Sequence, residues 1–296
     1  MDYSGIVKKS FEIAWTRKSL WFFGLFVAGG TGFNLDLPGD DLPGSLEDID
    51  AWLHPSGTTI IAVLGLIASL LGLYLLLNSL CSPALIDAVN RITRGGTYRF
   101  KDSLASGVDF FLRYLGLIIV AFFAETVAIG FIGGITVLFF LVNTVLGVLS
   151  LLVVIPLAIG LFALLWSVFF LSERALVVRN VSIADSIIEG YRLLRANLGR
   201  CLIMFLIYVG LSIGLGIGAG LLVLIVALPV SLMVAATGAG LLAGIMLGII
   251  LALPFSVVVG GFTGTALSSS YTLFYFGLVE PGGTTATPAV VETGTV

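Results

Sequence analysis

Two stretches of this chain are too apolar to fold in water. Between Tyr114 and Leu171 the only charged side chain is that of Glu125, and between Cys201 and Val279 there is none. A helix that crosses a bilayer core needs about 20 predominantly apolar residues, so each stretch is long enough for two crossings or more. Unbroken runs of Leu, Ile, Val, Gly and Ala favour helices over the alternating strands of a membrane barrel. The sequence therefore predicts an all-α integral membrane protein.

Composition supports this class and argues against several others. Charged residues make up 10% of the chain, whereas a soluble domain carries about 25%. Two cysteines and one histidine are too few for a metal cluster or a disulfide framework. Carboxylates cluster in one loop only, so no catalytic constellation is visible. We therefore expect no enzyme activity, no cofactor, no metal site and no nucleic-acid partner.

The basic residues fall into three segments, which predict the orientation of the chain. The loop over residues 31–57 is rich in Asp and Glu and contains no Lys or Arg. By the positive-inside rule, the basic segments lie in the cytoplasm and this acidic loop lies outside. The three segments are Lys8, Lys9, Arg17 and Lys18; Arg91, Arg94, Arg99, Lys101 and Arg113; and Arg174, Arg179, Arg192, Arg195 and Arg200.

This orientation limits the number of crossings. One crossing leaves the cytoplasm near residues 19–30 and one returns near residues 58–80. The stretch from Tyr114 to Leu171 begins and ends in the cytoplasm, so it holds an even number of crossings, and its length suits two. The last apolar stretch fits two or three, because no basic residue follows Glu280 to orient it. We predict about six transmembrane helices with both termini in the cytoplasm, and seven crossings is the alternative.

A half-polar helical pattern recurs and indicates how the crossings are organised. FKDSLASGVDFFLRYLG (100–116) and IADSIIEGYRLLRANLG (183–199) share Asp-Ser, Gly and Leu-Gly at the same spacing. Apolar positions at i, i+4, i+7 and i+8 define one helical face in both segments and again in residues 7–15. The pattern predicts three repeats, each an interfacial amphipathic helix followed by a transmembrane hairpin. The repeats cover about 3–95, 96–179 and 180–279 of a single membrane domain, 1–279, followed by a flexible tail, 280–296.

Each interfacial helix carries a serine and, four positions later, a small residue. Small residues at this spacing permit close contact between helices, so we predict that they form a packing face. The opposite face would direct Arg and Lys side chains toward lipid headgroups. Two interpretations stay open: the helices are plain connectors, or they engage lipids or partner proteins. The packing pairs are Ser10 with Ala14, Ser103 with Gly107, and Ser186 with Gly190.

Glu125 is the candidate intramembrane polar site. An acid at the bilayer centre costs about 2.5–3.5 kcal/mol on insertion scales, so Glu125 should face the helix bundle or water. It would suit a proton or cation relay, but no second charged residue lies within the same apolar stretch. The presence of this acid in an apolar stretch would also be explained if its carboxyl is protonated, or if it lies close to the outer surface of the membrane.

The interfacial pattern, present as FKDSLASG before an apolar hairpin, and the ending SSSYTLFYFGL carry a family resemblance. Together they resemble the multi-span membrane domain attached to some bacterial glycerophosphodiester phosphodiesterases, and related prokaryotic polytopic proteins. The resemblance extends from Tyr3 to Leu278, on degenerate motifs. It implies a multi-pass protein of the cytoplasmic (inner) membrane of a prokaryote. Phosphodiesterase chemistry is not expected, because no catalytic domain follows Leu278.

Two classes of function remain. The first is a noncatalytic membrane module that engages membrane lipids or other membrane proteins through its cytoplasmic-face amphipathic helices. The alternative is a transporter or permease subunit with a polar path near Glu125. An odd number of repeats, unlike the paired inverted repeats common in transporters, and the scarcity of intramembrane charge favour the first.

Overall fold

The computed structural model describes residues 1–32, 57–236 and 241–279. Of these residues 93% are helical and none lies in a strand, so the prediction of an all-α protein is confirmed for this part of the chain. Most of the predicted acidic loop (31–57) and the whole of the predicted tail (280–296) lie outside the described residues.

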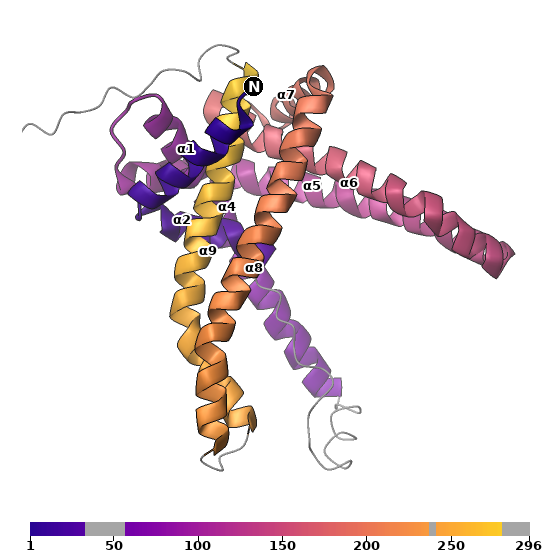
Figure 1. Cartoon of the computed structure of the whole chain (residues 1–296). Coiled ribbons are helices and arrows are strands. Elements are labelled where there is room, and N and C mark those ends of the chain that lie inside the picture. The colour runs from indigo at the N-terminus through magenta and orange to yellow at the C-terminus, as the bar shows by residue number, and fades with distance from the viewer. Residues whose placement is uncertain (33–56, 237–240, 280–296) are drawn as a thin grey trace, which may run out of the picture.

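Long helices dominate the described residues (Figure 1). The helices are α1 (Tyr3–Thr16), α2 (Leu20–Gly32), α4 (Gly57–Thr93), α5 (Phe100–Val142), α6 (Thr144–Arg179), α7 (Ile183–Ala196), α8 (Leu198–Ala236) and α9 (Leu241–Val279). Four helical stretches within the described residues are long and apolar enough to cross a membrane: Leu64–Thr93, Phe100–Val142, Thr144–Arg179 and Leu198–Val234.

Short polar side chains set several helix ends. The side chain of Asp2 accepts a hydrogen bond from the backbone N–H of Gly5 at the start of α1, and Ser182 caps α7 in the same manner. Asn143 separates α5 from α6, and its side-chain oxygen accepts from the N–H of Val145 at 2.8 Å. Such caps satisfy backbone donors that have no partner within the helix. Asn180 ends α6 in the left-handed region, with a φ of 52°.

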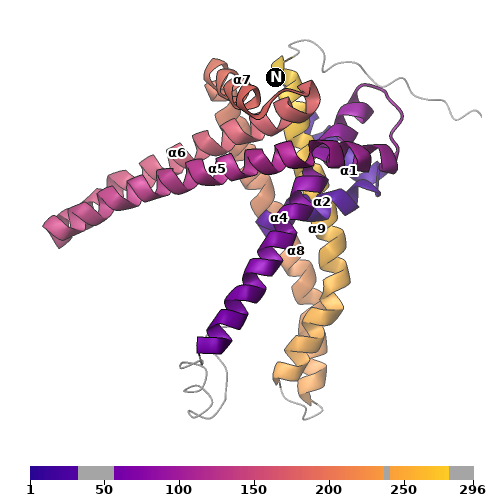
Figure 2. The same cartoon turned by 180° about the vertical axis from the view of Figure 1, so that it is seen from behind.

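The hairpins diverge from one region of close packing. In both views the α5–α6 hairpin extends to one side, away from the α8–α9 pair (Figures 1 and 2). The buried side chains gather where the C-terminal parts of α4, α6 and α9 meet, around Leu85, Ala175 and Phe274. Beyond this junction the apolar side chains of the helices are largely exposed, as expected of surfaces that face lipid.

The three segments predicted to be interfacial helices pack close to this junction. α1 packs on α9, the first turns of α5 pack on α4, and α7 packs on α6. α1 ends at Thr16 and α7 at Ala196, with Arg17 and Asn197 as their C-caps, so each is separate from the helix that follows it. The middle segment differs from the prediction of a separate interfacial helix, because α5 runs unbroken from Phe100 to Val142. The sequence around Gly116 contains no polar residue or proline that would end the helix. A single glycine lowers helix stability but does not interrupt the helix.

Candidate functional site

The predicted packing pairs lie on the buried faces of α1, α5 and α7. Ser10, Ser103 and Ser186 are fully buried, and so is Ala14. The hydroxyls of Ser10 and Ser186 donate to carbonyl oxygens of their own helices, each at 2.7 Å. Gly107 lies against Leu80 and Ala84 of α4, and Gly190 lies against Val168 and Ser172 of α6. The pairs therefore stand at the points where these helices approach their neighbours.

The opposite faces of the same helices are exposed and mix apolar with basic side chains. On α7, Ile188 and Tyr191 are 55% and 56% exposed, and Arg192 and Arg195 are exposed beside them. These four positions follow an i, i+3, i+4, i+7 spacing, which places them on one side of the helix. Trp15 with Lys8 on α1, and Val108 and Leu112 with Lys101 on α5, are exposed in the same way.

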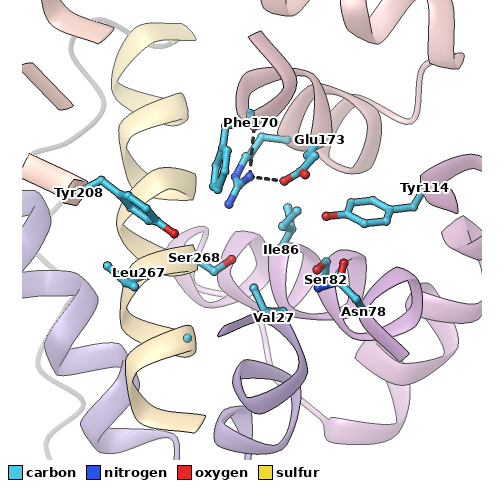
Figure 3. Close-up of a pocket in the computed structure, with 12 residues that line it drawn as sticks. Val27, Asn78, Ser82, Ile86, Tyr114, Phe170, Glu173, Tyr208, Leu267 and Ser268 are labelled. Carbon is cyan, nitrogen blue, oxygen red and sulfur yellow. Dashed lines mark hydrogen bonds and ion pairs between the residues drawn. The ribbon is translucent and has the colours of Figure 1, made fainter. Parts of the chain in front are cut away.

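A central cavity of about 100 Å³ lies at the junction of the helices (Figure 3). Residues of α2, α4, α5, α6, α8 and α9 contribute to its wall, and most of the wall comes from α4, α6 and α9. Its lining residues are Val27, Asn78, Ser82, Ile86, Tyr114, Phe170, Glu173, Arg174, Tyr208, Gly264, Leu267 and Ser268. Hydroxyl, amide, carboxylate and guanidinium groups share this wall, so the cavity suits water or a small polar species.

Two consecutive residues of α6 bring opposite charges to the central cavity. One guanidinium N–H of Arg174 donates to the Glu173 carboxylate at 2.5 Å, and the same nitrogen donates to the carbonyl oxygen of Phe170 at 3.1 Å. The Arg174 side chain is 2% exposed, and that of Glu173 is 20% exposed. The Tyr114 hydroxyl points from α5 toward Glu173 and also lies close to Ser82 (Figure 3). Each charge thus has a partner in a region that excludes most water.

Aromatic rings enclose the Arg174 guanidinium. Its central carbon lies 4.6 Å from the ring centre of Phe170 and 5.6 Å from that of Tyr271. Trp166 and Tyr208 extend the cluster, with ring centres 4.6 Å apart. A cation over aromatic faces is stabilised by the ring quadrupole, and the gain increases when the cation is shielded from water. This cluster explains how α6 keeps an arginine inside the protein.

The predicted site residue Glu125 lines a second hollow, which we call the α5–α6 groove. The groove has a volume of about 180 Å³ and lies between the two helices of the middle hairpin. Glu125 is half-buried there, and the groove also reaches Glu173, which lines the central cavity as well. The remaining lining residues are apolar: Leu117, Ile118, Ala121, Phe122 and Phe169.

Glu173 and Arg174 are site residues that the sequence pattern does not predict. The positive-inside rule places Arg174 with the basic cytoplasmic segments, whereas the structure buries it at the helix junction. One signal was present: SPALI, ERALV and SYTLF recur near the C-terminal ends of α4, α6 and α9, and only ERALV begins with charges. Ser82 and Glu173 open the first two of these endings, and both line the central cavity.

Among the described residues, no group of three or more His, Cys, Asp or Glu side chains is arranged to hold a metal ion. No family model, curated protein or solved structure matches the chain.

Proposed function

We propose that the protein is a noncatalytic membrane module that engages membrane lipids, or partner proteins, through α1, the first turns of α5, and α7. One observation carries this proposal. Each of these segments buries a serine-and-small-residue face on another helix and leaves basic and large apolar side chains exposed together. Such a helix suits the membrane interface, with its apolar side chains at the acyl boundary and its basic ones among headgroups.

α7 has the exposed face best suited to anionic lipid. Glu189 is engaged elsewhere, because it accepts from the Tyr275 hydroxyl and pairs with Arg179, both at 3.0 Å. Asp185 is exposed and accepts from the Ser182 hydroxyl, so it offsets one of the two arginines. The exposed face that holds Arg192 and Arg195 therefore carries a net positive charge. Lys and Arg near an anionic membrane surface contribute about 1 kcal/mol each.

Neutralising this face is expected to remove the preference for anionic lipid. Two lost charges correspond to about 2 kcal/mol, or roughly 30-fold weaker binding, in the variant Arg192→Gln/Arg195→Gln. Native mass spectrometry of the purified protein, titrated with phosphatidylglycerol and with phosphatidylcholine, measures the two affinities. The variant Arg192→Lys/Arg195→Lys keeps the charge and should bind as the parent does. Equal phosphatidylglycerol binding by the Gln variant and the parent would refute a lipid role for α7.

The proposed topology has six crossings, an outward-facing acidic loop and both termini in the cytoplasm of a prokaryote. It rests on the segregation of basic residues and on the resemblance to the phosphodiesterase-associated membrane domain. α2 is the shortest of the proposed crossings, because its 13 residues rise about 20 Å, against a bilayer core of about 30 Å. Six crossings of one bilayer also require the hairpins to lie closer to parallel than they do in Figure 1.

Transport is a second candidate function, and the α5–α6 groove favours it. Glu125 has a second acid, Glu173, in the same groove, and Glu173 borders the central cavity. Ionisable residues within membrane segments commonly mark ion or proton paths. A transporter or permease subunit would use the path from Glu125 through this groove to the central cavity.

A further inference from the structure

The α5–α6 groove joins two carboxylates from different helices. Glu125 on α5 and Glu173 on α6 both line it, and the walls between them are apolar. Leu117, Ala121 and Glu125 follow a spacing of four residues, so they lie along one face of α5. Since the Tyr114 hydroxyl lies close to Glu173, Glu125 stands further along α5, about 16 Å in helical rise from Tyr114. The groove thus leads from Glu125 to the edge of the central cavity.

Of the two carboxylates, Glu173 alone has a cationic partner among the described residues that line the groove and the central cavity. Arg174 is the positive group at the cavity, and it is already bound to Glu173. The other titratable groups that face the pair are Tyr114 on α5, Tyr208 on α8 and Tyr271 on α9, and phenols are neutral at physiological pH. No Lys or His is among the described residues that line the groove or the cavity. Glu125 therefore has no counter-charge in its groove.

A carboxylate between apolar walls is costly unless it is neutralised. A bound metal cation would require several oxygen ligands. Within the part of the chain that the structure describes, the side chains of the groove offer two carboxylates, and Arg174 already binds one of them. A proton requires a single oxygen. The proton is therefore the cation that suits this groove.

We propose that Glu125 holds an exchangeable proton, which passes through water in the α5–α6 groove to Glu173. In this step the O–H bond of Glu125 breaks and an O–H bond forms on Glu173, so one carboxylate is regenerated as the other is neutralised. At rest the proton lies on Glu125, because Arg174 stabilises the charged form of Glu173. Protonation of Glu173 weakens its bond to Arg174 and frees the guanidinium to interact with the central cavity. This inference rests on the transport candidate and is independent of lipid binding by α7.

Carbodiimide labelling tests the proton site directly. Dicyclohexylcarbodiimide adds to protonated carboxylic acids in apolar surroundings, and peptide mass spectrometry identifies the modified residue. In the full-length protein in lipid vesicles at neutral pH, we expect label on Glu125 and little on Glu173. Glu125→Gln should lose the Glu125 label, and Arg174→Gln should add label at Glu173. A parent protein that takes no label at Glu125 at neutral pH, but takes it in acid, would overturn the proposal, whether or not the Arg174 variant folds.

A measurement of proton flux distinguishes the proposed proton site from the proposed transport function. Vesicles that contain the protein and a pH-sensitive dye, with an imposed potential, report proton movement. We expect flux in the parent and its loss in Glu125→Gln, with folding unchanged by circular dichroism. Label on Glu125 without flux would support the proton site and reject transport. Flux that persists in Glu125→Gln would reject Glu125 as the carrier while transport survives.

Discussion

Replacing Arg174 by methionine is expected to lower the free energy of unfolding by about 3–5 kcal/mol, the usual loss when one partner of a buried ion pair is removed. Methionine keeps an unbranched apolar chain but leaves the Glu173 carboxylate without its cation. It also removes the hydrogen bond to the Phe170 carbonyl and the contact with the Phe170 and Tyr271 rings. Denaturant unfolding of the purified variant and parent, in the same detergent, measures the difference.

Two further variants isolate the cause of this loss. Glu173→Gln combined with Arg174→Met removes both charges and should recover much of the stability, because neither charge is then left unpaired. Arg192→Met removes an exposed arginine and should change the stability by no more than about 0.5 kcal/mol. If Arg174→Met and Arg192→Met have the same free energy of unfolding, the buried pair does not stabilise the junction.

Gly107→Leu and Gly190→Leu should each destabilise the protein at the upper end of the 1–3 kcal/mol range typical of overpacking, about 3 kcal/mol. A Cβ atom at Gly107 would lie 2.5 Å from the carbonyl oxygen of Leu80. At Gly190 it would lie 2.7 Å from the carbonyl oxygen of Val168 and 3.0 Å from the backbone nitrogen of Ser172. These neighbours are backbone atoms of another helix, so the helices must separate to admit a side chain. Thermal unfolding of the purified variants reads out the loss.

Gly130→Leu is the matched control for the two glycine variants. Gly130 lies in α5 like Gly107, but nothing stands within 4 Å of the position of its Cβ. The same substitution there should be neutral or slightly stabilising, since leucine favours a helix over glycine. Arg192→Ala and Asp109→Ala, at exposed positions, should also have small effects. Equal losses at Gly107, Gly190 and Gly130 would remove the close-packing role.

The class of fold could be predicted from the sequence because apolar blocks of this length, one with a single charge and one with none, have few alternatives to membrane helices. The all-α prediction is confirmed for the described residues, and four stretches within them are long and apolar enough to span a membrane. The place of the polar break between α5 and α6 was not predicted. Pro156 is the stronger interruption of the apolar stretch from Tyr114 to Leu171 in sequence, yet it lies inside α6. The role of Asn143 as a cap becomes visible only once its side chain is seen to accept from the N–H of Val145.

The candidate site could be predicted only in part. Glu125 stands out in sequence because it is a lone acid in an apolar stretch. Glu173 and Arg174 follow directly after the end of that stretch, where charged residues normally face water, so their burial could not be inferred. Nearly every side chain of α6 between Thr144 and Leu171 is apolar, so no polar stripe indicates which face turns toward α5. The shared groove of Glu125 and Glu173 depends on that rotation and on the packing of the hairpin.

The central claim is that the basic helices lie on the cytoplasmic face of the membrane. Measuring the orientation of the chain by cysteine labelling tests this claim most directly. Cysteines introduced one at a time at Ser45, in the acidic segment, and at Ala184, exposed on α7, would be treated with an impermeant maleimide. The native Cys81 and Cys201 are buried, so they contribute little background. We predict that intact cells label Ser45→Cys and that Ala184→Cys is labelled only after permeabilisation. Label on Ala184→Cys but not on Ser45→Cys in intact cells would contradict the claim.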